Sequence, residues 1–372
     1  MNVQNNRVFQ AFGVTAESPE WNDWRWQSRN RIMDAEHLSQ VLALSATEKA
    51  DISACLERFR MAITPYYASL IDPDDLCDPI RAQAVPSVNE MKIFPWEAAD
   101  PLNEDGTSPV QNIVHRYPDR VVFFVTRYCA VYCRHCTRRR LVGEEDAPIS
   151  GKEIDAAIEY IRKTPEIRDV LLSGGDPLTL SDERLDAILT PLREIGHVDI
   201  IRIGTRAPVT MPMRITPALL SVLKKFQPIW INTHFNHPKE LTGASVKACA
   251  EIVDAGIPMG NQSVLLKGVN DNTETMKELV LGLVKARVRP YYLYQCDISE
   301  GLQHFRADVR TGIKIIQDLT GYTTGFAVPK YVIDAPGGGG KIPANPEYIT
   351  SIDDEKVVMR NYLGQIYHYP QS

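Results

Sequence analysis

What the sequence lacks limits the classes of protein that it can encode. It has no run of about 18 consecutive apolar residues, the length that a membrane-spanning helix needs. Its N-terminus, MNVQNNRVFQAFG, lacks the basic start, apolar stretch and cleavage site of a secretory signal. The formal net charge is −6, whereas nucleic-acid-binding proteins usually carry a basic excess. We therefore expect a cytoplasmic protein that acts on a small molecule, with neither a membrane nor a nucleic acid as its partner.

Cysteine is also scarce. Seven cysteines among 372 residues are too few for a disulfide framework, and an odd number leaves one unpaired. Cys129, Cys133 and Cys136 nevertheless lie within the eight residues CAVYCRHC. The other four stand alone in mixed or apolar surroundings and are interpreted as buried, unreactive thiols: Cys55, Cys77, Cys249 and Cys296. The three clustered cysteines therefore need a chemical explanation.

From about residue 120, short runs of β-branched and aromatic residues alternate with longer segments of helical periodicity. Strands are predicted to start near residues 120, 168, 198, 228, 258, 290 and 329, and helices near residues 151, 181, 216, 245 and 275. Such alternation predicts parallel strands with crossover helices, in a barrel or an open α/β sheet. Six or seven units are visible, where a complete (β/α)8 barrel needs eight.

The regularity of this pattern divides the chain into three regions. Residues 1–110 lack the alternation and are predicted to be mainly helical, residues 111–341 to form the barrel, and residues 342–372 to form a short C-terminal extension. Within the extension, KVVMRNYLGQIYHY predicts a hairpin that turns at Leu363 and Gly364.

Polar motifs lie at the C-terminal end of nearly every predicted strand. CAVYCRHC follows the first strand, SGGD ends the second, GTRAP the third and THFNHP the fourth. Residues 261–263 lie within the fifth strand, while residues 295–297 and DAPGGGGK follow the last two. One such motif alone is more often a turn. Seven in register predict an active site, because barrel enzymes build theirs from these loops.

The spacing of the three cysteines, C-x3-C-x2-C, favours an iron–sulfur cluster over zinc. A structural zinc site normally has four ligands in two separated pairs, and His135 is squeezed beside Cys136, where binding the same ion is awkward. Zinc is therefore a disfavoured alternative. Three thiolates can instead hold three irons of a [4Fe–4S] cluster and leave the fourth iron open to a ligand from outside the protein.

This spacing at the end of the first strand of a βα barrel resembles the radical S-adenosylmethionine superfamily. In that superfamily, S-adenosylmethionine binds the open iron and is cleaved to a 5′-deoxyadenosyl radical by one electron from the cluster. SGGD is similar to the glycine-rich motif of the superfamily, which implies that Gly174, Gly175 and Asp176 contact the methionine amino group. Three further contacts of the same cofactor are implied: His135, His234 and Gln262.

DAPGGGGK invites comparison with a phosphate-binding P-loop, but it departs from that motif. A P-loop requires Gly five residues before its Gly-Lys pair and Ser or Thr after it, where this chain has Ala335 and Ile342. Pro343 would also disrupt the helix that follows a P-loop. We interpret the segment as a flexible glycine run that presents Lys341 at the mouth of the barrel. Such a lysine is either a surface residue or one suited to imine exchange with pyridoxal phosphate.

A closer resemblance covers nearly the whole chain, from WNDWRWQ to the glycine run. Its marks are HRYPDR, CRHCTRRR, LLSGGDP, THFNHP, GNQSVLL, RPYYLYQCD and DAPGGGGK. The sequence is similar to the lysine 2,3-aminomutase family, whose members use S-adenosylmethionine and pyridoxal phosphate. This resemblance implies a partial (βα)6-type open TIM barrel, with Lys341 as the Schiff-base lysine. It also implies that Arg116 and Arg120 bind the phosphate, which suits two arginines four residues apart.

Three residues are implied for the substrate. Arg138 pairs with the α-carboxylate, unless RRR (138–140) is only a solvated basic turn. Asp297 and Asp334 hold the distal ammonium of lysine, because glutamate-specific relatives carry other residues there. L-Lysine is the expected substrate, and L-arginine is the alternative that charge alone leaves open. Lys330 is expected to face away from the pocket.

The implied activity interconverts L-α-lysine and L-β-lysine by a 5′-deoxyadenosyl radical and pyridoxal phosphate. A one-electron reductant of the flavodoxin or ferredoxin type and a homo-oligomer, either a dimer or a tetramer, are expected. No zinc is expected, because no cysteine follows Cys296. A second class of function is a radical S-adenosylmethionine enzyme that modifies RNA or protein, with residues 138–140 in its binding surface. The acidic net charge and Lys341 count against that alternative.

Overall fold

The seven runs of β-branched and aromatic residues form parallel strands of one sheet, as the sequence predicts. The computed structural model describes residues 6–142 and 149–371. The parallel strands are β2 (Arg120–Thr126), β3 (Asp169–Gly174), β4 (Ile200–Gly204), β5 (Ile229–Thr233), β6 (Met259–Leu265), β7 (Arg289–Gln295) and β8 (Lys330–Ala335). Their order in the sheet follows their order in the chain, so the predicted partial barrel is confirmed.

An antiparallel strand lies at each edge of this sheet, and the sequence does not predict either of them. β1 (Ile113–Tyr117) pairs with β2, and β9 (Gly340–Pro343) pairs with β8. The hydroxyl of Tyr117 accepts a hydrogen bond of 2.9 Å from the backbone N–H of Lys341. The two edges of the open barrel are thus joined beside the lysine that is predicted to bind pyridoxal phosphate.

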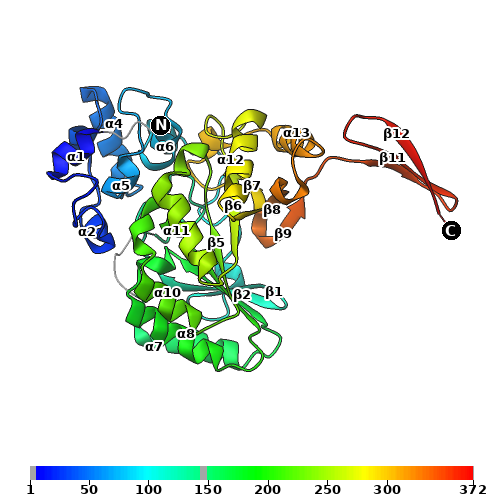
Figure 1. Ribbon diagram of the computed structural model, residues 1–372, viewed down its shortest axis with the longest axis horizontal. Helices are drawn as coiled ribbons and strands as arrows, with labels where there is room; N and C mark the ends of the chain where they lie inside the picture. Colours follow the sequence, from blue (N-terminus) through cyan, green and yellow to red (C-terminus); the bar gives the residue numbers. More distant parts are fainter. Residues whose placement is uncertain (1–5, 143–148, 372) are drawn as a thin grey trace.

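Crossover helices connect the parallel strands and surround the sheet (Figure 1). They are α7 (Gly151–Arg162), α8 (Asp182–Arg193), α10 (Pro217–Lys224), α11 (Gly243–Asp254), α12 (Thr273–Lys285) and α13 (Val309–Leu319), of which α13 is not predicted from the sequence. Side chains such as Ser150 and Asn272 cap their first turns, and apolar faces such as Ile154 and Ile158 join the core. Shorter helices lie in the connections: η3 (Pro177–Thr179), α9 (Ala207–Thr210), η4 (Pro212–Arg214), η5 (Pro238–Glu240), η6 (Gln303–Phe305), η7 (Gly325–Ala327) and η8 (Pro336–Gly338).

The N-terminal helices pack over the cysteine segment at the C-terminal ends of the strands. They are α1 (Asn6–Phe12), α2 (Trp24–Arg29), α3 (Ala35–Val41), α4 (Ala46–Leu56), α5 (Pro65–Ala68), α6 (Pro79–Ala84), η1 (Val88–Met91) and η2 (Asp105–Thr107). Trp24 and Ala130 belong to one small apolar cluster with Met211, and the Arg31 guanidinium donates to the Cys129 carbonyl at 2.7 Å. The backbone N–H of Arg134 donates to the carbonyl of Gln83 at 2.9 Å. These contacts fix the backbone that carries the three cysteines.

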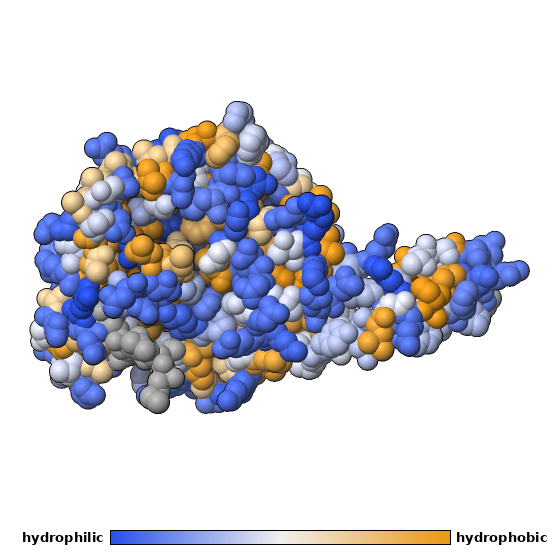
Figure 2. Space-filling model, turned by 90° about the horizontal axis from the view of Figure 1, so that it is seen from above, coloured by the Kyte–Doolittle hydropathy of each residue, from blue (hydrophilic) through white to orange (hydrophobic). Residues whose placement is uncertain are grey.

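A second, three-stranded antiparallel sheet projects from the barrel (Figure 1). It consists of β10 (Ile349–Ile352), β11 (Lys356–Arg360) and β12 (Ile366–Pro370), and the β11–β12 pair is the predicted hairpin. Large apolar side chains lie on its surface, as Figure 2 shows; Ile352 is 65% exposed and Tyr369 64%. Across residues 6–142 and 149–371, no helix is long and apolar enough to span a bilayer.

Candidate active site

A cavity of about 650 Å³ lies inside the barrel, between the strands and the cysteine segment. Every residue to which the sequence assigns a role lines this cavity: Arg116, Arg120, Cys129, Cys133, His135, Cys136, Arg138, Gly174, Gly175, Asp176, His234, Gln262, Asp297, Asp334 and Lys341. These residues span more than two hundred positions of the chain, and the βα topology brings them to one place. The individual roles of these residues stay predictions.

The glycines of SGGD let this turn pack directly on the chain that leads from β2 into the cysteine segment. A side chain at Gly174 would place its Cβ 2.4 Å from the Thr126 carbonyl oxygen, and one at Gly175 would lie 2.3 Å from the Tyr128 carbonyl oxygen. Gly174 also has φ +107°, which side chains disfavour. The backbone N–H of Gly175 donates to Thr126 at 2.6 Å. Glycine is therefore required here for packing, in addition to any contact with a ligand.

The three cysteine thiols open onto the cavity but lie deep in the protein. Burial raises the pKa of Cys129 well above its ordinary value, and that of Cys136 to about 11, so the thiolates need a cation to be stable. Within the described part of the chain, no three Cys, His, Asp or Glu side chains are arranged to hold a single metal ion. A [4Fe–4S] cluster, in which each thiolate binds a different iron, needs no such convergence.

Two histidines beside the cysteines are neutral and face the same cavity. Burial holds the pKa of His135 well below its ordinary value and lowers that of His234 to about 4. Asn236 lies 3.3 Å from Nε2 of His135, while Nδ1 of His135 is buried without a partner among the residues described. Gln262 lies 3.4 Å from Nε2 of His234. The unpaired nitrogen of His135 is a group that a bound ligand can satisfy.

Asp176 is engaged with its own surroundings. Its carboxylate accepts hydrogen bonds from the Thr205 hydroxyl at 2.6 Å and from the backbone N–H groups of Leu178 at 3.0 Å and Arg206 at 2.8 Å. It thereby holds the GTRAP loop against the SGGD turn. A contact between Asp176 and a cofactor amino group would have to share an oxygen that already accepts a hydrogen bond.

Arg116 and Arg120 lie on the antiparallel strands β1 and β2. Nη2 of Arg116 donates to the Leu102 carbonyl at 2.5 Å, and its Nε is buried with no partner among the residues described. Arg120 pairs with Asp119 at 2.7 Å and lies 4.0 Å from the ring centroid of Tyr117. An unpaired guanidinium nitrogen on a residue that lines the cavity is a possible donor to a phosphate group, so the observed geometry suits the predicted role best at Arg116.

The glycine run that precedes Lys341 forms a turn held by hydrogen bonds, and its flexibility stays a prediction. The N–H of Gly337 donates to the Pro101 carbonyl at 2.8 Å, and Gly340, at φ +83°, lies where a Cβ would be 3.1 Å from the Tyr117 hydroxyl. The turn leads directly into β9, where Lys341 is the antiparallel partner of Asp334. The position of Lys341 in the cavity is thus set by strand pairing.

Lys341 and Asp334 form an ion pair in the cavity. Nζ of Lys341 lies 3.3 Å from Oδ1 of Asp334 and 5.3 Å from the ring centroid of Tyr294. Tyr294 in turn donates to Gln262 at 2.9 Å. Lys330, on the same strand as Asp334, is exposed to solvent, as expected for a side chain that faces away. Asp334 therefore already binds an alkylammonium group in this structure.

The three arginines of RRR are not a solvated basic turn, because each of them is paired with an acidic residue. Arg138 donates to Glu104 through two nitrogens, with the shortest distance 2.8 Å. Arg139 pairs with Glu90, and Arg140 pairs with Asp105 at 2.9 Å. These acidic partners, which the sequence does not single out, lie in the N-terminal region. Their charge also makes RRR a poor surface for RNA.

Asp297 is a buried carboxyl whose titration predicts a pH dependence. Burial, with a contribution from Asp334, raises its pKa to about 6, although Thr137 donates a hydrogen bond to it. The ionised form is the one that binds an ammonium group, so kcat/KM for a cationic substrate is expected to fall about tenfold per pH unit below pH 6. A pH profile checks this, and Asp297→Asn is expected to lose that limb. If the acidic limb of the pH profile were unchanged in the variant, a group other than Asp297 would be responsible for it.

Similarity to known proteins defines the class first. The family model described as "Radical SAM superfamily" matches residues 123–280, which hold the cysteine segment and the strands from β3 to β6. The protein therefore contains a radical S-adenosylmethionine domain. The model described as "Lysine-2,3-aminomutase" matches residues 316–372, including β8, β9 and the projecting sheet.

Curated relatives then define the family. The L-lysine 2,3-aminomutase of Clostridium subterminale is 54% identical over 98% of this chain and 88% of its own length. That of Acetoanaerobium sticklandii is 56% identical over 95% of this chain and 85% of its own length. The glutamate 2,3-aminomutase of Clostridioides difficile is 45% identical over 98% of this chain and 86% of its own length. This chain belongs to the lysine 2,3-aminomutase family, which confirms the resemblance drawn from its motifs.

Proposed function

We propose that this protein is an isomerase that interconverts L-α-lysine and L-β-lysine by moving an amino group between neighbouring carbons. The observation that carries the proposal is the ion pair between Lys341 and Asp334. It places an alkylammonium group against a carboxylate inside the cavity that also holds three cysteine thiols. A second carboxylate, Asp297, lies close enough to Asp334 for the charge of Asp334 to contribute to the raised pKa of Asp297. Two carboxylates favour a cationic side chain over glutamate.

Cys129, Cys133 and Cys136 would hold a [4Fe–4S] cluster, with S-adenosylmethionine beside it near His135 and the SGGD turn. When bound, these groups supply one-electron chemistry that removes a hydrogen atom from an unactivated carbon. The unpaired Nδ1 of His135 and the three thiols that face the cavity support this assignment.

Lys341 and Arg116 would hold pyridoxal phosphate, with Arg120 nearby. When bound, it supplies a conjugated ring that spreads unpaired electron density next to the migrating nitrogen. The support is the unpaired Nε of Arg116 and the amine of Lys341, which line the same cavity.

The residues of the chain itself bind and orient the substrate. Arg138, held by Glu104, would receive the α-carboxylate, and Asp297 and Asp334 the distal ammonium. Fixing both ends of lysine places its Cα and Cβ at a defined position, which lowers the entropic part of the barrier.

The test of this function is an assay of substrate choice. Reduced, iron-reconstituted protein with S-adenosylmethionine and pyridoxal phosphate is offered lysine, arginine, ornithine and glutamate separately, and β-amino acid products are measured. We expect turnover of lysine and none of glutamate. Turnover of arginine with inert lysine would show that the mechanism is right and the substrate wrong.

Metal analysis tests the cluster independently of activity. Anaerobically purified protein is expected to contain about four irons per chain without stoichiometric zinc. Replacing Cys133 with alanine is expected to lower the iron content, because one of three protein ligands is lost. Stoichiometric zinc with little iron would contradict the cluster assignment.

A one-electron reductant of the flavodoxin or ferredoxin type would serve this enzyme in the cytoplasm, and we propose that it works as a homo-oligomer, a dimer or a tetramer. The exposed apolar side chains of the projecting sheet, among them Ile352, Ile366 and Tyr369, support an association between subunits. We also keep the division of the chain into residues 1–110, 111–341 and 342–372 as a proposal.

A further inference from the structure

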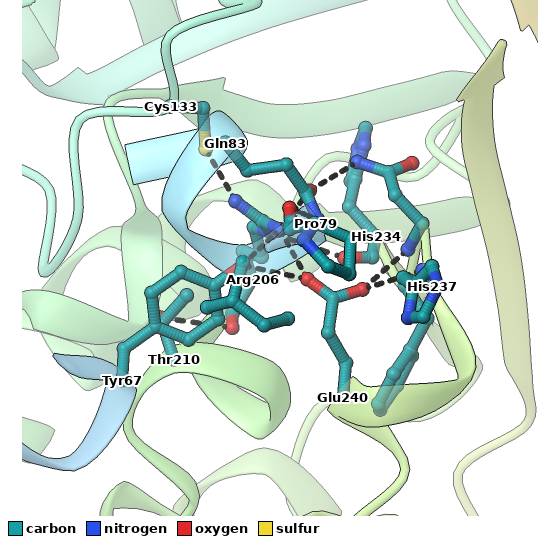
Figure 3. Close-up of polar contacts among 12 residues, drawn as sticks. Tyr67, Pro79, Gln83, Cys133, Arg206, Thr210, His234, His237 and Glu240 are labelled. Atoms are coloured by element: carbon teal, nitrogen blue, oxygen red, sulfur yellow. Dashed lines mark hydrogen bonds and ion pairs between the residues drawn. The ribbon is translucent and has the colours of Figure 1, made fainter. Parts of the chain in front are cut away.

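Arg206, in the GTRAP motif after β4, donates a hydrogen bond to a cysteine thiol that the proposed function assigns to the cluster. Nη1 of Arg206 lies 2.8 Å from Sγ of Cys133 (Figure 3). Its Nε donates to the carbonyl of His234 at 3.1 Å, and its backbone N–H donates to Asp176 at 2.8 Å. One residue thus contacts three of the positions predicted to surround the cluster and S-adenosylmethionine.

The guanidinium of Arg206 is buried, and its surroundings hold it in one orientation. Nη2 donates to Glu240 at 2.6 Å, to Gln83 at 2.7 Å and to the Tyr67 hydroxyl at 2.9 Å (Figure 3). Glu240 is itself fully buried and also accepts from the backbone N–H groups of residues 236 and 237. Tyr67, Gln83 and Glu240 come from three separate elements. A charge held this tightly cannot reorient when the charge of a neighbouring group changes.

Burying a guanidinium and a carboxylate costs free energy of desolvation, so packing alone does not explain this arrangement. A buried ion pair is often no more stable than apolar side chains of the same volume. A guanidinium stays protonated in proteins, and Arg206 is held between Cys133 and Glu240, so it is a permanent cation at this site. Hydrogen bonds to the cysteine sulfurs and nearby charge are the means by which proteins set the reduction potential of an iron–sulfur cluster.

We propose that Arg206 is a positioning residue that raises the reduction potential of the cluster by donating a hydrogen bond, and a positive charge, to the sulfur of Cys133. The inference rests on the proposed function, since it requires a cluster on the three cysteines. Reduction adds one electron to the cluster while a one-electron donor loses one, and no proton or leaving group moves. The added negative charge is stabilised by the fixed guanidinium, so the reduced cluster is favoured.

The test is a redox titration of iron-loaded protein, followed by the spectroscopic signal of the reduced cluster. In the Arg206→Gln, Glu240→Gln double variant both buried charges are removed together, so neither is left unpaired. We expect its equilibrium constant for reduction to fall about tenfold, a midpoint lower by about 59 mV for one electron. Arg206→Lys keeps the charge and is expected to shift the midpoint less.

Two single variants make the result specific to charge at this sulfur. Glu240→Gln alone leaves Arg206 less neutralised, so the midpoint is expected to rise, opposite in sign to the double variant. Arg214→Lys is the matched control for Arg206→Lys, because Arg214 is also buried, pairs with Asp182 at 2.7 Å and donates to the Leu178 carbonyl at 2.6 Å. Its midpoint is expected to equal that of the parent.

The outcomes separate this inference from the proposed function. An unchanged midpoint in the fully iron-loaded double variant would overturn the role of Arg206 and leave the proposed function intact. If the double variant binds no iron, the Glu240→Gln midpoint decides, and a value equal to or below that of the parent overturns the inference. Parent protein that binds no iron would instead overturn the proposed function.

Discussion

Replacing Lys341 with alanine is expected to abolish conversion of lysine, with a loss in kcat/KM of at least about 10³-fold. The visible absorbance of protein-bound pyridoxal phosphate is expected to disappear in the same variant. The physical reason is that the Lys341 amine lies in the cavity at a position fixed by pairing of β9 with β8. No neighbouring side chain can replace the covalent bond that the Lys341 amine is expected to form with pyridoxal phosphate.

Two matched variants separate loss of the amine from loss of charge. Lys341→Arg keeps a cation opposite Asp334 but cannot form an imine, so it is expected to be as inactive as the alanine variant. Lys330→Ala removes an exposed lysine at the start of β8 and is expected to leave both absorbance and turnover unchanged. Activity in Lys341→Arg would mean that the lysine serves only as a charge, contrary to the proposed function.

The barrel strands are predictable from the sequence because their residues are locally consistent with buried parallel strands. Runs such as RVVFFVT and VDIIRIG are rich in β-branched side chains and are bounded by polar motifs. The edge strands β1 and β9 carry no such signal. β1 is the short run IVHRY, and β9 begins at the last of four glycines, so both depend on pairing with strands that are already in place.

The residues that line the cavity are predictable for a different reason, which is topology. The C-terminal ends of parallel strands meet at one edge of a sheet, so polar motifs at those ends converge whatever lies between them. Cys129 and Asp297 belong to loops after the first and sixth parallel strands and both line the cavity. For such residues, spacing along the chain is enough to predict proximity.

The partners of those residues are not predictable in this way. Arg206 contacts Tyr67, Gln83 and Glu240, and the first two lie more than a hundred positions away in the N-terminal region. Arg138 is held by Glu104 in the same manner. Pairings of this kind depend on how helices of low amphipathic regularity dock over the barrel, and no local pattern in the sequence encodes that docking.

Asp334→Asn is expected to lower kcat/KM for lysine by about 10²- to 10³-fold. Removing one charge from a buried ion pair costs about 2–5 kcal/mol, and Asp334 faces the cavity where the substrate ammonium is proposed to bind. Asn keeps the size of the side chain, and it leaves Lys341 available for the cofactor. Pyridoxal phosphate absorbance is therefore expected to persist, so that the loss can be assigned to substrate binding.

The Asp334→Asn variant also distinguishes a carboxylate that binds the substrate from one that only holds the protein structure. Glu300→Gln is the matched control, because Glu300 lies three residues beyond Asp297 and pairs with Arg58 on the surface at 2.7 Å. Exposed pairs contribute about 0–1 kcal/mol, so this variant is expected to turn over lysine as the parent does. If Asp334→Asn lost its cofactor absorbance together with its activity, the role of Asp334 would be to position Lys341. The specificity for a cationic side chain would then depend on Asp297 alone, and Asp297→Asn would become the variant that abolishes discrimination between lysine and glutamate.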